Sequence, residues 1–166
     1  MKKLLKPISI ALLVILIIIQ FFRPEKNIAA SNAAFANDIT KVYAIPTQVQ
    51  EILKASCYDC HSNNTKYPWY ANVQPVAWWL SDHVEEGKKE LNFSEFATFP
   101  IRRKYKKMEE IIDEVKEDEM PLSSYTVLHR YARLSKDQKN QLINWATSIR
   151  DTIKATYPAD SLLRKK

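Results

Sequence analysis

Apolar residues are concentrated at the N-terminal end of the chain. The run from Ile8 to Phe22 has only Ser9 and Gln20 as polar members, and it follows a short lysine-rich start. At about 1.5 Å per residue the run reaches roughly 22 Å, and flanking leucines and snorkelling lysines can extend it towards a bilayer core of roughly 30 Å. The nearest Ala-x-Ala pattern, at residues 34–36, is separated from the run by charged residues. We therefore expect residues 1–26 to be an uncleaved membrane anchor, with a cleavable signal sequence as the alternative.

Downstream of the anchor the pattern becomes helical. Residues 27–39 are rich in Ala, Asn and Ser without periodicity, which indicates a tether, and the folded unit should cover residues 40–157, followed by a basic tail over 158–166. Apolar positions then recur at helical spacing. The segments with this spacing are 47–56, 75–91 and 136–154. The pattern predicts an all-α fold.

The last predicted helix has a clear start. Ser135 and Gln138 have the spacing of a capping box, in which each side chain bonds the backbone N–H of the other residue. Its apolar residues form one stripe, so we expect this helix to pack on the helix that precedes Cys57 and to close a cofactor slot with it.

Composition narrows the function classes. The chain has 166 residues and a single glycine, Gly87, which argues against a turn-rich β fold and against a glycine-rich phosphate loop. The net charge is +6, but removing the first 26 residues leaves 20 bases and 18 acids, a net of +2. The folded part therefore has no general attraction for nucleic acid, and neither nucleic acid nor nucleotide is an expected partner.

The most specific pattern is Cys57-Tyr58-Asp59-Cys60-His61, which contains both cysteines of the chain. C-x-x-C-H is the attachment motif of haem c: two thiols on one turn add to the vinyl groups of a single porphyrin, and the histidine becomes the proximal iron ligand. A zinc site would need further Cys or His pairs, a thioredoxin-type dithiol would need a βαβ unit, and a structural disulfide would leave the histidine unexplained. We expect one covalently attached haem.

A haem also requires a pocket wall and a partner for the second ring nitrogen of His61. The aromatic residues at positions 67–70 are expected to line the haem pocket, with ordinary core packing as the alternative. The backbone carbonyls of Pro68 and Pro75 are the candidate hydrogen-bond acceptors for His61.

Candidates for the second axial ligand can be sorted by position. Met108 shares a helical face with apolar residues and is expected in the core, whereas Met120 precedes a proline after an acidic stretch, where a helix should end. From such a loop Met120 can approach the iron on the side opposite His61. His83 is the main alternative ligand, His129 is expected to pack among tyrosines, and an open or water-bound site is the remaining possibility.

A dipolar stretch precedes Met120. Five bases lie in residues 102–107, and seven acids against one lysine lie in residues 109–119. The stretch fits a solvated helix face, and the alternative is a docking patch for a charged redox partner.

The motif and several blocks around it are similar to one known family. These blocks are Ser56 to Asn63, Tyr67-Pro68-Trp69-Tyr70, Pro75-Val76, Asp82-His83, Glu86-Gly87-Lys88, Leu91-Asn92-Phe93-Ser94, Met120-Pro121 and Leu134-Ser135 to Trp145. They resemble the small haem-binding domain family of membrane-anchored monohaem c-type proteins, over about residues 43–153. The resemblance implies a cytochrome c-like helical domain with one haem, outside the cytoplasmic membrane, in which Met120 occupies the family's Met-Pro position.

Together these features predict a single-pass protein of the cytoplasmic (inner) membrane, with a haem domain facing the periplasm that passes electrons to a redox partner protein. No catalytic residue is expected. The alternatives are a haem sensor whose distal ligand leaves to admit a gas or peroxide, and a peroxidase-like enzyme that would need His83 or His129 as distal base.

Overall fold

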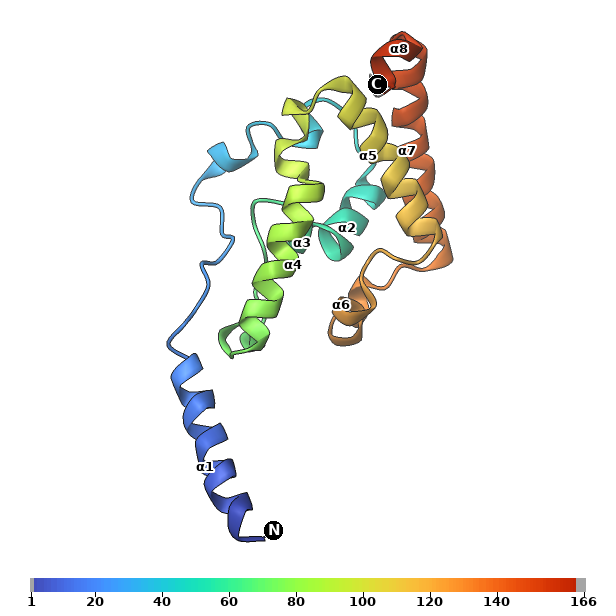
Figure 1. Ribbon diagram of the computed structural model, residues 1–166. Helices are drawn as coiled ribbons and strands as arrows, with labels where there is room; N and C mark the ends of the chain where they lie inside the picture. The colour runs from blue at the N-terminus through green and yellow to red at the C-terminus, as the bar shows by residue number, and fades with distance from the viewer. Residues whose placement is uncertain (1, 164–166) are drawn as a thin grey trace.

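A computed structural model describes residues 2–163. Over these residues the chain is built of helices without any strand, which confirms the all-α class (Figure 1). The α-helices are α1 (Lys2–Ile19), α2 (Thr47–Ser56), α3 (Tyr58–His61), α4 (Val76–Glu90), α5 (Ile101–Lys116), α6 (Ser123–Leu128), α7 (Lys136–Thr156) and α8 (Ala159–Leu162). Short 3₁₀ helices are η1 (Asn32–Phe35), η2 (Ile39–Lys41), η3 (Trp69–Asn72), η4 (Phe93–Thr98) and η5 (Arg130–Ala132).

The core lies where α5, α7 and α2 meet. Helix α7 runs alongside α5 in Figure 1. It also contacts α2, which confirms the prediction that the last long helix packs on the helix that precedes Cys57. Met108 and Leu142 are fully buried between these helices, so the prediction that Met108 is a core residue is confirmed. The larger partner of α7 is nevertheless α5, because α5 has a long apolar stripe that α7 covers.

The start of α7 has the predicted cap. The backbone N–H of Gln138 donates to Ser135 Oγ at 3.2 Å, and the backbone N–H of Ser135 donates to Gln138 Oε1 at 2.9 Å. Two N–H groups that the helix leaves unpaired are thereby satisfied.

Helix α1 projects from one end of the domain (Figure 1), and its apolar side chains from Leu5 to Leu16 are largely exposed. Among residues 2–163 no helix is both long enough and apolar enough to span a bilayer. The transmembrane helix expected from the sequence is therefore not confirmed.

Residues 27–39, expected to form a tether, are hydrogen-bonded to the domain. The Asn27 side-chain amide donates to the Ser62 carbonyl at 2.8 Å and to Thr65 Oγ1 at 2.9 Å. Ile39 is completely buried in the core. These contacts hold the segment against the loop that follows His61.

At the other end of the chain, Leu162 of α8 is buried against the core. The basic residues 164–166 of the expected tail lie outside the described residues.

Candidate cofactor site

The two cysteines and His61 are presented by consecutive turns. Leu53 is buried at the end of α2, and its carbonyl accepts from the N–H of Cys57 at 3.0 Å. The chain then bends at Cys57 (φ −126°), and the carbonyl of Cys57 accepts from the N–H of His61 at 3.0 Å. Both cysteines are free, half-buried thiols. A buried apolar face on α2 thus fixes the position of the turn that carries the motif.

Two adjoining cavities meet at this turn, with volumes of about 420 Å³ and about 300 Å³. Both sizes are typical of small-molecule sites. Cys57, His61 and Met120 line both cavities, and Cys60 lines the second. The larger cavity has an apolar wall from four elements, formed by Leu53, Leu91, Phe93, Ile111, Val115 and Leu142. The structure therefore brings together the four cofactor residues expected from the sequence.

His61 is held in one orientation. Its Nδ1 lies 2.9 Å from the carbonyl oxygen of Leu91, which requires the proton on Nδ1 and leaves Nε2 with a free lone pair. Burial lowers the pKa of His61, so the neutral ring that a metal requires is favoured. The prediction that the carbonyl of Pro68 or Pro75 accepts this hydrogen bond from His61 is wrong. Leu91 serves because it ends α4, where carbonyls have no helical N–H partner.

Met120 lies in the loop after α5, as predicted. The carbonyl of Glu114 accepts from the N–H groups of Glu119 and Met120, at 3.0 and 3.2 Å, so the loop folds back onto the helix end. Asp118 makes the turn with a φ of 62°, and its carboxylate pairs with Lys139 of α7. These contacts place the Met120 side chain on the walls of both cavities.

The two histidines outside the motif differ in placement. His83 lines the second cavity, and its Nδ1 lies 2.8 Å from the Trp79 carbonyl, which requires the proton on Nδ1 and leaves Nε2 with a lone pair. His129 lines neither cavity and uses both ring nitrogens, with Tyr70 Oη at 3.1 Å and the Tyr125 carbonyl at 3.2 Å. His129 therefore packs among tyrosines as expected.

The prediction that the aromatic residues at positions 67–70 line the pocket is wrong. None of the aromatic residues at positions 67–70 lines either cavity, and Trp69 is 79% exposed. Tyr67 Oη instead accepts from the backbone N–H of Asn27 at 2.8 Å. The apolar wall comes from helices α2, α5 and α7, whose periodic positions serve the core and the cavity together, and from Leu91 and Phe93 after α4.

Gly87 is a site residue that the sequence analysis missed. A Cβ atom at this position would lie 2.8 Å from the carbonyl oxygen and 3.1 Å from the Cβ of Cys60. Only glycine allows α4 to pack so closely on α3. The available signal was that the single glycine of the chain falls inside a predicted helix, where it needs a packing reason.

A second missed contact joins the motif to α6. Tyr125 Oη donates to Asp59 Oδ2 at 2.7 Å, while Asp59 Oδ1 accepts from the N–H of Lys66 at 3.1 Å. Burial and the Asp59 carboxylate both raise the pKa of Tyr125, which keeps the phenol protonated as a donor. This bond fixes α6, and hence the end of the Met120 loop, to the motif.

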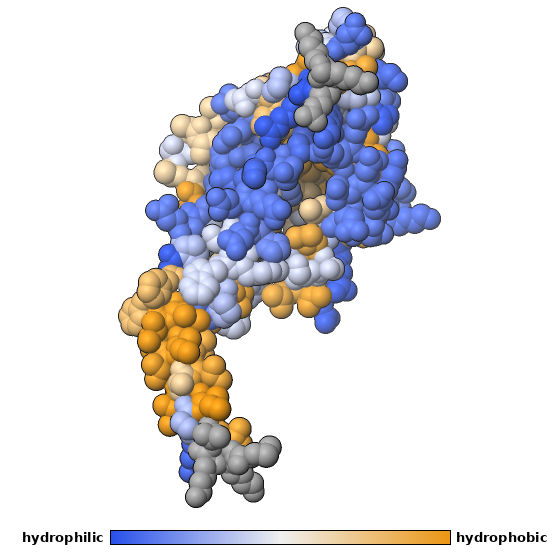
Figure 2. All heavy atoms as spheres, viewed as in Figure 1, coloured by the Kyte–Doolittle hydropathy of each residue, from blue (hydrophilic) through white to orange (hydrophobic). Residues whose placement is uncertain are grey.

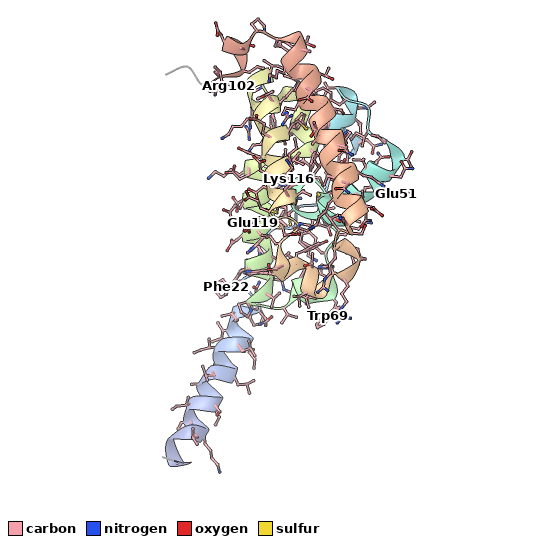
Figure 3. The ribbon with its side chains drawn as sticks, turned by 90° about the vertical axis from the view of Figure 1, so that its right-hand side faces the viewer. Phe22, Glu51, Trp69, Arg102, Lys116 and Glu119 are labelled. Atoms are coloured by element: carbon pink, nitrogen blue, oxygen red, sulfur yellow. The ribbon has the colours of Figure 1, made fainter. Side chains whose placement is uncertain are left out.

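The dipolar stretch does not form a purely solvated face. Lys107 is buried on the cavity side of α5 and pairs with Glu90 and Glu110. Burial opposes ionisation of Glu110, but hydrogen bonds from Lys107 and Lys106 outweigh it and lower the pKa of this carboxyl. Figure 3 shows Arg102 and Lys116 at opposite ends of α5.

Comparison with known proteins agrees with this site. A model of a family described as the haem-binding domain matches residues 14–148. The chain belongs to the haem-binding domain family. The match includes the whole of α2 to α6 and the first part of α7, and therefore all the candidate-site residues described above. Searches of curated proteins and of solved structures gave no match.

Proposed function

We propose that this member of the haem-binding domain family is a monohaem c-type cytochrome that transfers electrons. Cys57 and Cys60 would form the thioether bonds, His61 would be the proximal ligand and Met120 the distal ligand. The observation that carries the proposal is that the cysteine motif and Met120, which are far apart in sequence, line the same two cavities.

The residues present fit a covalently attached haem. The Nδ1 of His61 is engaged by Leu91, so its Nε2 is free to coordinate iron. The thiols are not consumed by a disulfide; Cys57 lines both cavities and Cys60 lines the second, and both cavities have volumes suited to a small molecule. A thioether sulfur is a neutral ligand suited to the other axial position.

When bound, haem supplies a one-electron redox centre, and the protein tunes and orients it. The Leu91 carbonyl keeps the His61 ring in one tautomer and raises its basicity. The apolar wall excludes water, while the Glu114 and Asp118 contacts hold the Met120 loop in place. Firm ligation on both sides suits electron transfer, since little has to rearrange.

His83 supports a second candidate, a haem sensor or peroxidase-like protein. It reaches the second cavity with a free Nε2 and could act there as a distal ligand or base. This role would require Met120 to leave or never to bind.

The apolar α1 supports a membrane location. Its exposed side chains from Leu5 to Leu16 need an apolar environment, and a lipid bilayer supplies one. We propose attachment to the cytoplasmic membrane with the haem domain on the periplasmic side, where haem c is attached, and a redox partner protein in reach.

The test is the absorption spectrum of the full chain, produced together with a c-type haem maturation system. We expect haem that stays attached through acid acetone extraction, and a weak red band from methionine sulfur on ferric iron. Met120→Ala should abolish the band and admit carbon monoxide to the reduced protein. Met108→Leu, a change of the buried core methionine, and His83→Ala are the matched controls and should keep the band.

Pigment that is lost in acid acetone would refute covalent attachment. A band that survives Met120→Ala but disappears in His83→Ala would reverse the assignment of the distal ligand. Prompt carbon monoxide binding by the unchanged protein would favour the sensor.

A further inference from the structure

The end of the domain from which α1 projects has an exposed apolar surface. We call it the α6 face and define it by Trp69, Val73, Val127, Leu128 and Tyr131, with exposed fractions of 79%, 43%, 62%, 59% and 65%. Figure 3 shows Trp69 at the same end of the domain as Phe22, and Figure 2 shows apolar and weakly polar atoms gathered at that edge, beside the apolar helix. An exposed patch of this kind indicates an interaction surface.

The parts of this face are linked to each other. Tyr70 of η3 hydrogen-bonds through its Oη to His129 Nε2 at 3.1 Å. The His129 ring lies between Tyr125, at 4.1 Å, and Tyr131, at 5.6 Å, measured between ring centroids. The η3 segment therefore forms one surface with α6 and η5, although η3 lies about 60 residues before them in sequence.

The charged residues of the segments that form this face are all basic. Residues 60–81 and 120–135 contain no aspartate or glutamate, although the chain has 19 acids. The same segments contain Lys66, Arg130 and Arg133, all of which are exposed. Apolar, aromatic and basic segments that contain no acids complement the headgroup layer of an anionic bilayer.

The segment that follows α1 is hydrogen-bonded to the domain beside this face. Gln20 and Gln74 exchange two bonds, from Gln20 Nε2 to the Gln74 carbonyl at 3.3 Å and from the Gln74 N–H to Gln20 Oε1 at 3.0 Å. Trp78 Nε1 donates to the Phe22 carbonyl at 2.7 Å, and Lys26 Nζ donates to Asn72 Oδ1 at 2.8 Å. The point where the chain leaves α1 therefore lies against the domain, beside the α6 face.

We propose that the α6 face rests on the headgroup layer of an anionic phospholipid bilayer, next to the point where α1 leaves the membrane. The inference rests on the membrane attachment of α1 proposed above. Trp69 and Tyr131 have the amphipathic rings that favour the interface, and Arg130 and Arg133 would contact lipid phosphates. A second copy of the chain fits less well, because a symmetric contact would place these uncompensated bases opposite one another.

The test measures the depth of a nitroxide label on the full chain with haem attached, in vesicles of phosphatidylcholine with and without phosphatidylglycerol. Val127→Cys places the label on the α6 face, and Thr156→Cys places it at the far end of α7. Because Cys57 and Cys60 are bonded to haem, each variant has one free thiol. Compared with the label at position 156, we expect the label at position 127 to collide severalfold less often with a water-soluble nickel chelate and more often with oxygen. The difference between the two positions should be larger in vesicles that contain phosphatidylglycerol. The label at position 156 should stay fully accessible to nickel.

Equal nickel accessibility at the two positions, in a chain that floats with the vesicles, would overturn the inference and leave the membrane attachment of α1 intact. Shielding of position 127 that persists in detergent together with a dimeric mass would also overturn it, because a second copy would then cover the face. Labelling of the unsubstituted chain would show free thiols and would refute the proposed haem attachment, which separates that failure from the other two.

Discussion

Gly87→Ala is predicted to destabilise the protein, although the same change in an ordinary helix is stabilising. Alanine at an interior helix position is favoured over glycine by about 1 kcal/mol. At this position the new Cβ would lie 2.8 Å from the Cys60 carbonyl oxygen. Ordinary contacts begin near 3.4 Å, so α3 and α4 must separate by about 0.6 Å.

The cost should exceed the gain because both sides of the contact are helix backbone. Overpacking in a tight interior typically costs about 1–3 kcal/mol, and a backbone carbonyl cannot turn away as a flexible side chain can. We expect a net loss of about 1–2 kcal/mol in the free energy of unfolding, or several degrees in the melting temperature. The same displacement would stretch the 2.9 Å bond between His61 Nδ1 and the Leu91 carbonyl, since both helices carry its ends.

The assay combines thermal unfolding of the protein with haem attached and a redox titration followed by its visible spectrum. A weaker bond to His61 makes the imidazole less basic, so the reduction potential should rise. Lys89→Ala, an exposed change two residues along the same helix, is the control and should alter neither quantity appreciably. A Gly87→Ala protein that is about 1 kcal/mol more stable than the parent, with an unchanged potential, would refute the reasoning.

Three further predictions concern the motif itself. Tyr125→Phe removes the 2.7 Å bond to the Asp59 carboxylate, worth about 1.5–3 kcal/mol, and so loosens the Met120 loop. Added imidazole should then displace Met120 from the iron at a lower concentration, which a spectral titration would measure. Tyr157→Phe is the control, and equal titrations in the two variants would contradict the role given to the bond. Before haem is attached, burial raises the pKa of Cys57 to about 12 and that of Cys60 to about 11, so alkylation at neutral pH should be slow and should not reach half its maximal rate near pH 9. Because the folded chain holds these protons more tightly than the unfolded chain, the apoprotein should have its full stability below the ordinary thiol pKa of 9.0 and lose stability as the pH rises towards 12, which denaturant titrations across this range would measure.

Local patterns were sufficient to predict much of the fold. The capping box at Ser135 and the apolar stripe of α7 involve neighbours in sequence, and both were located correctly. The position of Met120 after a helix end was also predictable, because the following proline and the preceding acids mark that end.

The errors concern contacts between distant segments. The acceptor for His61 is a helix-end carbonyl 30 residues away, and no local pattern distinguishes Leu91 from Pro68 or Pro75. Aromatic character alone favours a pocket role for the residues at positions 67–70, but hydrogen bonds of Tyr67 to Asn27 and of Tyr70 to His129 hold them on another face. Which side of the molecule an aromatic residue occupies depends on tertiary structure, which residue type does not specify.

Helix α4 has a consequence that its sequence does not suggest. Its N-terminal end is joined to α1 through Gln74 and Trp78, and its C-terminal end supplies the carbonyl that orients His61. Its 15 residues form a stiff lever about 22 Å long. A displacement of the turn that follows the N-terminal helix can therefore be carried along this lever to the carbonyl that sets the rotation of the imidazole.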